Sequence, residues 1–211
     1  MPSMRAVIFD MDGVLLDSCA DHEAAWKSIW EDFHIQDEFD FSSMSGMDTD
    51  EIAEMLHQKF GVDAEAIAAR KHEHERNLKV NYMQGAEELI STLKARFILG
   101  LGTSSPTQSL KAYDAKLGFL ANFKEYVNSE LVERAKPAPD IYREVARRLD
   151  VPPEECCVIE DSGNGIKAAK AAGMKCIAIM NNYLSVKDMQ LADAAVENLS
   201  EITIDMIEKL R

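Results

Sequence analysis

Long apolar runs are absent from this sequence. The longest, residues 97–101 and 176–180, are only as long as a β-strand, whereas a membrane-spanning helix needs about 20 apolar residues. Near the N-terminus only residues 6–9 form an apolar stretch, which is too short for the core of a secretory signal peptide. We therefore expect a cytoplasmic protein without a membrane span.

Basic residues are also scarce. The chain has 23 Lys and Arg against 37 Asp and Glu, which gives a formal net charge of −14. So acidic a surface repels the phosphates of nucleic acids and of anionic membranes, and we expect neither as a partner. A small phosphate ligand is not excluded, because a lysine or a Mg²⁺ ion can reverse the sign of the charge inside one pocket.

The few cysteines show no spacing typical of a zinc site or a redox motif. No two of them form a CxxC pair, and two are adjacent; they are Cys19, Cys156, Cys157 and Cys176. This pattern predicts four reduced and mostly buried thiols, as is usual in the cytoplasm.

The composition is that of a soluble globular protein. Hydrophobic residues make up 46% and charged residues 28% of the 211 positions. A chain of this length buries a sizeable core without disulfides or a structural metal. The length suits one domain, or one domain that carries an insertion.

The N-terminal third predicts a short strand followed by helices. Residues 5–10 read as a buried strand that ends in a carboxylate. From residue 18 to about residue 81 the apolar residues recur at helical spacing, beginning with Trp26 and Ile29. This region predicts several amphipathic helices and no strand.

Polar residues in this region predict helix starts and an exposed face. Asp17 and Ser18 are expected to cap the first helix, and Asp48 or Thr49 a later one. Residues 70–76 are all charged or histidine, which is typical of a solvated helix face.

After Gly85 the pattern alternates between helix and strand. Alternation over such a length predicts a doubly wound, parallel α/β sheet covered on both faces. We expect a core of residues 1–17 and 82–211, with a helical cap inserted over residues 18–81. The predicted strands are 97–102, 126–127, 156–160 and 175–180, and the predicted helices are 85–96, one through Leu110 and Leu117, one from Pro139 to Leu149, 163–172 and about 200–210.

Polar residues follow several of these strands. In an open parallel sheet, ligands bind beyond the carboxyl ends of the strands. Carboxylates gathered there repel one another and require a cation, and oxygen ligands favour Mg²⁺ over zinc. A phosphate is the natural ligand to bridge the metal, a lysine and a hydroxyl. The candidate residues are Asp10, Asp12, Thr103, Ser104, Lys136, Glu160 and Asp161.

Four of these segments together resemble the signatures of the haloacid dehalogenase superfamily of phosphotransferases. Residues 9–14, Phe-Asp-Met-Asp-Gly-Val, resemble its first motif. Thr103, Lys136 and the pair Glu160-Asp161 match the three later motifs, in order. The helical insertion is similar to the smaller cap class of that superfamily, and the resemblance covers nearly the whole chain.

The resemblance implies a role for each matched residue. Asp10 is expected to be the nucleophile that forms an aspartyl-phosphate, and Asp12 the general acid and then the base. Thr103 and Ser104 are expected to bind phosphoryl oxygens, and Lys136 to offset their charge. The implied Mg²⁺ ligands are Asp10, the Asp12 backbone carbonyl, Asp161, and Glu160 directly or through water.

The resemblance also narrows the reaction. Asp12 favours phosphate esters over carbon–halogen or carbon–phosphorus bonds, because an alkoxide leaving group needs a proton. The cap is similar to that of β-phosphoglucomutase and its phosphatase relatives. His22 stands twelve residues after Asp10, as a histidine does after the nucleophile of those mutases, and Arg70-Lys71 resembles their cap Arg-Lys pair, whose lysine reaches the active site. Those mutases carry a phosphate-binding arginine three residues after a cap glycine. In this chain the third residue after Gly46 is Thr49.

We therefore expect a Mg²⁺-dependent phosphatase of a small phosphomonoester, such as a sugar phosphate, acting as a monomer or a weak dimer. A β-phosphoglucomutase-type mutase is the alternative. Two remoter alternatives are a receiver-type signalling domain, which is shorter and lacks a helical insertion, and a catalytically silent binding relative.

Overall fold

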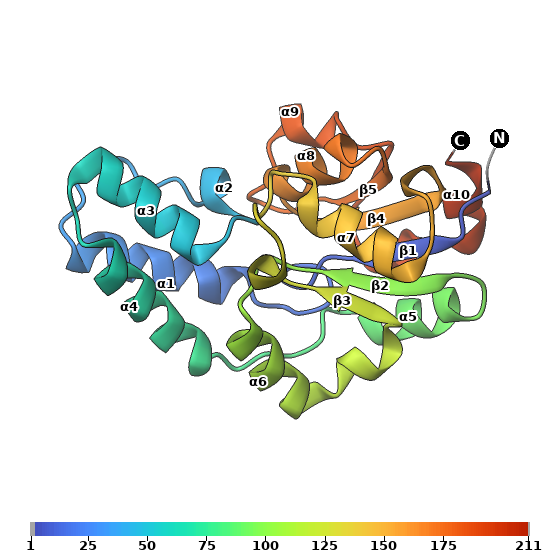
Figure 1. The fold of residues 1–211 in the computed structure, drawn as a ribbon, viewed down its shortest axis with the longest axis horizontal. Coiled ribbons are helices and arrows are strands. Elements are labelled where there is room, and N and C mark those ends of the chain that lie inside the picture. Colours follow the sequence, from blue (N-terminus) through green and yellow to red (C-terminus); the bar gives the residue numbers. More distant parts are fainter. Residues whose placement is uncertain (1–2, 211) are drawn as a thin grey trace.

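The computed structural model describes residues 3–210 and is built around one sheet of six parallel strands (Figure 1). The strand order is β3-β2-β1-β4-β5-β6. The strands are β1 (Ala6–Phe9), β2 (Ile98–Gly102), β3 (Glu125–Val127), β4 (Cys156–Glu160), β5 (Lys175–Ile179) and β6 (Ala194–Val196). β1 lies between β2 and β4, so the carboxyl ends of these three strands meet.

Helices cover both faces of the sheet, which confirms the predicted doubly wound α/β class. β1 shows the reason, since Val7 and Phe9 pack into one apolar cluster, while Ala6 and Ile8 pack into another on the opposite face. The first cluster includes residues of α5 (Ala86–Lys94), α6 (Thr107–Leu117) and α10 (Ile204–Lys209), and the second residues of α7 (Asp140–Leu149) and α8 (Gly163–Ala171).

A second group of helices lies at one end of the molecule, beside the carboxyl ends of the strands (Figure 1). These are α1 (Cys19–Asp32), α2 (Phe41–Met44), α3 (Thr49–Phe60) and α4 (Ala64–Arg76). They enclose an apolar cluster of their own, which includes Trp26, Ile29 and Leu56. We call residues 19–76 the cap and the sheet with its helices the core.

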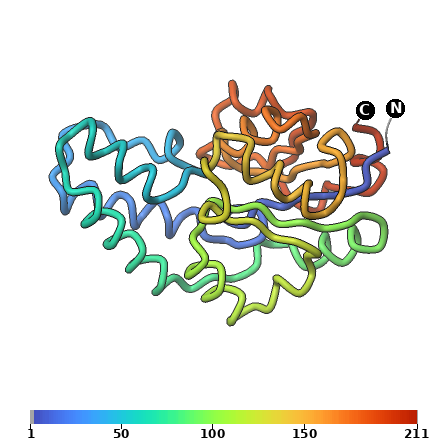
Figure 2. The backbone as a smooth tube through the Cα atoms, in the orientation of Figure 1, coloured from blue at the N-terminus to red at the C-terminus, as the bar shows by residue number. Residues whose placement is uncertain are grey.

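Two neighbouring segments connect the core to the cap (Figure 2). The backbone N–H of Asp17 donates to the carbonyl of Asn81 at 3.0 Å, and that of Met83 to the carbonyl of Leu15 at 2.8 Å. The predicted domain boundaries, 1–17 with 82–211 and 18–81, remain a prediction that this arrangement supports.

Most predicted elements have a counterpart within one or two residues, and the differences concern short segments. The sequence reasoning missed α2, α9 (Val186–Met189) and β6. The last predicted helix is divided into a 3₁₀ turn, Leu199–Glu201, and α10. Three further 3₁₀ turns span Phe119–Asn122, Ser129–Leu131 and Pro153–Glu155. Each of the three missed elements has only three or four residues, which leaves little periodicity for a sequence pattern to detect.

Two other expectations concern cysteines and membranes. All four cysteines are free thiols, and three of them are buried. Within residues 3–210, no helix is both long enough and apolar enough to cross a bilayer.

Candidate active site

The ends of three adjacent strands bring the predicted core residues together. Asp10 follows β1, Thr103 follows β2, and Glu160 is the last residue of β4, with Asp161 directly after it. Because β1 is central among the three, Asp10 lies between the hydroxyl of one neighbour and the carboxylates of the other. All four residues are buried.

Lys136 reaches this cluster from the loop before α7. Its ammonium donates to Asp10 Oδ1 at 2.6 Å, to Glu160 Oε1 at 2.8 Å and to the Gly102 carbonyl at 3.0 Å. The side chain is fully buried, and burial alone lowers the pKa of a lysine. The adjacent carboxylates outweigh that effect and raise the pKa of Lys136, so it stays charged.

Glu160 is held by protein donors on both oxygens. Oε1 accepts from Lys136 and from the Tyr142 hydroxyl, and Oε2 accepts from Ser162 Oγ and from two backbone N–H groups. A Cβ on Gly165 would lie 1.6 Å from Glu160 Oε1, so only glycine leaves room for this carboxylate. The arrangement fixes Glu160 as the counter-ion that positions Lys136.

The carboxylates of this cluster are suited to a hard divalent cation. Asp10, Glu160 and Asp161 each offer an oxygen, and these atoms lie within 4.8 Å of one another. Burial and the charge of Glu160 raise the pKa of Asp161, and burial raises that of Asp10 to about 7 despite Lys136. Buried carboxylates that oppose each other in this way fit Mg²⁺, which prefers oxygen ligands.

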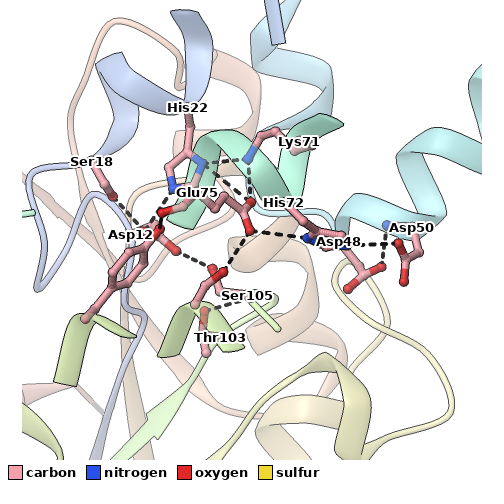
Figure 3. A network of polar contacts seen from close by, with 12 residues as sticks. Asp12, Ser18, His22, Asp48, Asp50, Lys71, His72, Glu75, Thr103 and Ser105 are labelled. Carbon is pink, nitrogen blue, oxygen red and sulfur yellow. Dashed lines mark hydrogen bonds and ion pairs between the residues drawn. The ribbon is translucent and has the colours of Figure 1, made fainter. Parts of the chain in front are cut away.

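Asp12 has a contrasting environment (Figure 3). Ser18 Oγ and His22 Nε2 contact its Oδ1 at 2.7 and 3.2 Å, and Ser105 Oγ donates to its Oδ2 at 2.7 Å. Burial works to raise the pKa of Asp12, but His22 and the two hydroxyls outweigh it and hold the pKa at about 2. Asp12 is therefore ionised in this state.

The expectation for Ser18 was wrong. Ser18 occupies the position before α1, but its side chain makes no cap hydrogen bond and donates to Asp12 instead. The neighbouring Asp17 is exposed. Of the two candidates for α3, Asp48 is the cap, since its carboxylate accepts from the N–H groups of Asp50 and Glu51. Thr49 is buried and lines the site cavity.

Of the two predicted phosphate-binding hydroxyls after β2, that of Thr103 contacts the core and that of Ser104 contacts the cap. Thr103 is buried, and its Oγ1 accepts from the Ser105 N–H at 3.0 Å. Ser104 Oγ donates to the Gly46 carbonyl of the cap at 2.7 Å. Both line the cavity beside Asp10 and Asp12, where their predicted role in phosphate binding stays a prediction.

The cap closes the cavity over these groups. Asn164 Nδ2 donates to the carbonyls of Ser43 and Ser45 at 3.1 and 2.9 Å, and the hydroxyl of Tyr183 donates to Glu23 at 2.8 Å. These bonds add to that between Ser104 and the cap. The structure thus shows the cap in contact with the core.

The predicted solvated face of residues 70–76 is only partly present. Arg70 is partly exposed and Glu73 exposed, and they pair at 3.1 Å. Lys71 and Glu75 are buried, contact each other (Figure 3) and line the cavity. The expectation of a solvated face was wrong for these two residues because α4 packs between α1, α3 and α6, which leaves only part of its surface to solvent. For Lys71, the family resemblance had separately implied a position at the site.

Sequence reasoning missed several residues that contact the cluster. Ser105 adjoins Thr103 and Ser104, so the strand-end rule that found them applies to it as well. Asn181 lies beyond β5 and donates to Asp161 Oδ2 at 2.9 Å. Glu75 stands four residues after Lys71, a spacing that places both on one helix face. Cys19 Sγ lies 3.3 Å from Asp161 Oδ2, and no pattern in the sequence indicated this contact.

Comparison with known proteins agrees with this geometry. A family model described as haloacid dehalogenase-like hydrolase matches residues 4–173. The β-phosphoglucomutase of Bacillus subtilis (strain 168) is 29% identical over 219 residues, covering 98% of this chain and 95% of its own. The fructose-1-phosphate phosphatase YqaB of Escherichia coli (strain K12) is 31% identical, covering 82% and 95%. The crystal structure of CbbY from Rhodobacter sphaeroides in complex with phosphate has a TM-score of 0.78 at 26% identity, covering 94% and 96%.

Proposed function

Because the chain belongs to the haloacid dehalogenase-like hydrolases, we propose that it is a Mg²⁺-dependent phosphatase of a small phosphomonoester. The main support for this proposal is the position of Asp10. Its carboxylate contacts Lys136 and lies close to that of Asp161, and it shares a cavity with Asp12. One carboxylate is thereby available to attack phosphorus and a second to move protons. The proposal includes action in the cytoplasm as a monomer or weak dimer.

Asp10 is the nucleophile in the first half-reaction. Lys136 holds its Oδ1, so Oδ2 forms the new bond to phosphorus while the bond from phosphorus to the alcohol oxygen breaks. Mg²⁺ at this cluster would supply positive charge that offsets the repulsion between the phosphate and the carboxylates. Asp10 and Asp161 would hold it, with the Asp12 carbonyl, and Glu160 acts through Lys136 or a water.

Asp12 moves the protons in both halves. A bound phosphate adds negative charge beside Asp12 and raises its pKa, which favours the protonated form that donates to the departing alcohol. After the alcohol leaves, the ionised Asp12 takes a proton from water. The water oxygen then bonds to phosphorus, and the bond from phosphorus to Asp10 Oδ2 breaks.

The cavity and the relatives support a sugar phosphate or a similar metabolite as the substrate. The cap closes over the site and excludes bulky phosphoproteins. The relatives include a fructose-1-phosphate phosphatase and a β-phosphoglucomutase. Thr49 is a neutral residue in the cavity wall, which favours a phosphatase over a mutase that must bind two phosphates.

The test is phosphate release from a panel of phosphorylated metabolites, with Mg²⁺ and with a chelator. The panel includes β-glucose 1-phosphate, with and without glucose 1,6-bisphosphate, and the products are identified. We expect metal-dependent release from one or a few esters. Conversion of β-glucose 1-phosphate to glucose 6-phosphate with little free phosphate would establish a mutase instead.

A further inference from the structure

A buried ion pair of the cap borders the cavity. Lys71 and Glu75 lie one turn apart on α4, and their side chains are only 2% and 3% exposed. Lys71 Nζ is 2.5 Å from Glu75 Oε1, and both residues line the cavity (Figure 3). The proposed phosphoryl transfer uses Asp10, Asp12 and Lys136 and assigns no task to Glu75.

Lys71 has further contacts that lead to the core. Its ammonium lies 2.9 Å from His22 Nδ1 and 5.5 Å from the centre of the Trp26 ring. Since an ammonium only donates, His22 Nδ1 accepts, and Nε2 carries the hydrogen donated to Asp12. Glu75, Lys71, His22 and Asp12 thus form one continuous chain of contacts (Figure 3).

Glu75 is fixed from both parts of the molecule. Its Oε2 accepts from Ser109 Oγ at 2.8 Å, and Ser109 is a buried residue of the core helix α6. His72 Nδ1 lies 3.5 Å from the same oxygen. The carboxylate is therefore anchored independently of Lys71, and its charge stays at the ammonium while the cap is closed.

The rest of the cap wall offers no other positive charge to an anionic group of a ligand. Apart from Lys71, Glu75 and the imidazole of His22, the cap side chains along the cavity are apolar or neutral, chiefly Trp26, Phe41, Met44, Met47, Thr49 and Ile52. Because Glu75 cancels the charge of Lys71, the pair offers no net positive charge to a ligand. A second anionic group on the substrate would lose its hydration there without gaining a partner.

We infer that Glu75 is a specificity-determining residue: by compensating the charge of Lys71, it restricts the site to phosphate esters of uncharged alcohols. The inference rests on the proposed phosphatase function and names its substrate class. It selects against leaving groups that carry a second phosphate or a carboxylate.

The test compares esters that differ by one phosphate. We would measure kcat/KM for fructose 1-phosphate against fructose 1,6-bisphosphate, and for β-glucose 1-phosphate against β-glucose 1,6-bisphosphate. In Glu75→Gln the ammonium of Lys71 is uncompensated, and the bisphosphate-to-monophosphate ratio should rise at least about tenfold. Glu73→Gln, which removes an exposed charge from the same helix, should leave the ratio unchanged. An unchanged ratio in a folded Glu75→Gln protein would overturn the inference.

Two further variants keep the inference testable if Glu75→Gln does not fold. Lys71→Met leaves the negative charge of Glu75 uncompensated, so the ratio should fall below that of the wild type. Lys71→Met with Glu75→Leu removes both charges, and because the net charge is then unchanged, the ratio should stay within about threefold of the wild type. A ratio that rises in Lys71→Met would contradict the assignment.

A binding measurement separates this inference from the proposed function. If the wild-type protein releases phosphate neither from these four esters nor from any other member of the metabolite panel, the phosphatase proposal fails. Calorimetric titration of the same four esters into Asp10→Asn and into Asp10→Asn with Glu75→Gln, both with Mg²⁺, still tests the inference. The second protein should bind the bisphosphates at least about tenfold more tightly relative to the monophosphates, and equal relative affinities would refute the role of Glu75.

Discussion

At the scale of single residues, two aspartates only two positions apart have opposite electrostatic environments. Burial raises the pKa of Asp10 to about 7 although Lys136 contacts it, whereas His22 and two serine hydroxyls overcome burial and hold the pKa of Asp12 at about 2. Two carboxylates whose pKa values differ in this way can take different tasks in one reaction. In this state the order of the two pKa values is the reverse of what a nucleophile and a proton donor need. The proposed roles therefore require a bound cation to lower the pKa of Asp10 and a bound phosphate to raise that of Asp12.

Replacing Asp10 by asparagine should abolish turnover and preserve the fold. The variant lacks the nucleophile, so kcat should fall by at least about 10³-fold. The two side chains are nearly the same size, and burial already disfavours the charge of Asp10, so the melting temperature should change by less than about 5 °C. Phosphate release and thermal unfolding measure the two effects.

The control for this variant is Asp205→Asn, an equivalent change at an exposed position of α10. It should retain wild-type turnover. Substantial phosphatase activity in Asp10→Asn would show that another group attacks phosphorus.

At the scale of elements, the connection between α2 and α3 determines how closely the cap approaches the core. Gly46 has φ of +81°, and a Cβ there would lie 2.2 Å from Ser162 Oγ of the core. Its carbonyl also accepts from Ser104. Only glycine permits this turn and this close approach.

Gly46→Ala should therefore impair closure of the cap. We expect kcat/KM to fall by about tenfold or more, because small misplacements of a closing element reduce turnover steeply. Gly61→Ala is a matched control, since Gly61 has a similar φ of +70° and no atom within 4 Å of the added Cβ. The control should lose about 1 kcal/mol of stability and no activity. Equal kinetics for the two variants would contradict the close contact.

On α4, the buried Glu75 should make the stability of the protein depend on pH. Burial works to raise the pKa of Glu75, but His72, Lys71 and His22 outweigh it and hold the pKa well below its usual range. A lowered pKa stabilises the fold at pH values above the ordinary glutamate pKa of about 4.3, and this stabilisation is lost as the pH falls.

Glu75→Gln should accordingly be destabilised near neutral pH by about 3 kcal/mol, because Lys71 stays buried without its partner. The difference in unfolding free energy between this variant and the wild type should become smaller as the pH falls below about 4. Urea unfolding at pH 7, 5 and 3.5 measures it, with Glu73→Gln as the exposed control, which should differ from the wild type by less than about 1 kcal/mol. A gap that is independent of pH would show that the charge of Glu75 contributes little to stability.

At the scale of the whole molecule, the closed cap and the sheet together bury the acidic cluster of Asp10, Glu160 and Asp161. Lys136 is the buried lysine that pairs with two members of this cluster. The negative charge that remains resists closure and folding unless a cation reduces it. Metal binding should therefore couple to the stability of the entire protein.

Saturating Mg²⁺ should stabilise the protein by about 2.7 kcal/mol at a concentration 100 times its Kd, with a melting temperature raised by roughly 5–10 °C. A chelator should reverse the shift. Asp161→Asn, which removes one proposed ligand, should show a much smaller response. Thermal scans at fixed pH test this, and a response of equal size in the variant would place the metal elsewhere.

The sequence by itself determined which chemical groups meet at the edge of the sheet. Alternating helices and strands predicted a parallel sheet, and parallel strands end at one edge, so Asp10, Thr103 and Asp161 had to lie near one another. Their catalytic and metal-binding roles remain predictions, which the variants above test.

Only the tertiary structure decided which cap residues face the cavity. Residues 70–76 are charged or histidine throughout, and the composition of this run does not distinguish the buried Lys71 and Glu75 from the exposed Glu73. The family resemblance singled out Lys71 but not Glu75. The same holds for Ser18, whose hydroxyl bonds Asp12 rather than the helix it precedes. A local pattern fixes the periodicity of a helix, but burial of a given side chain depends on the elements that pack against it, and these come from distant parts of the chain.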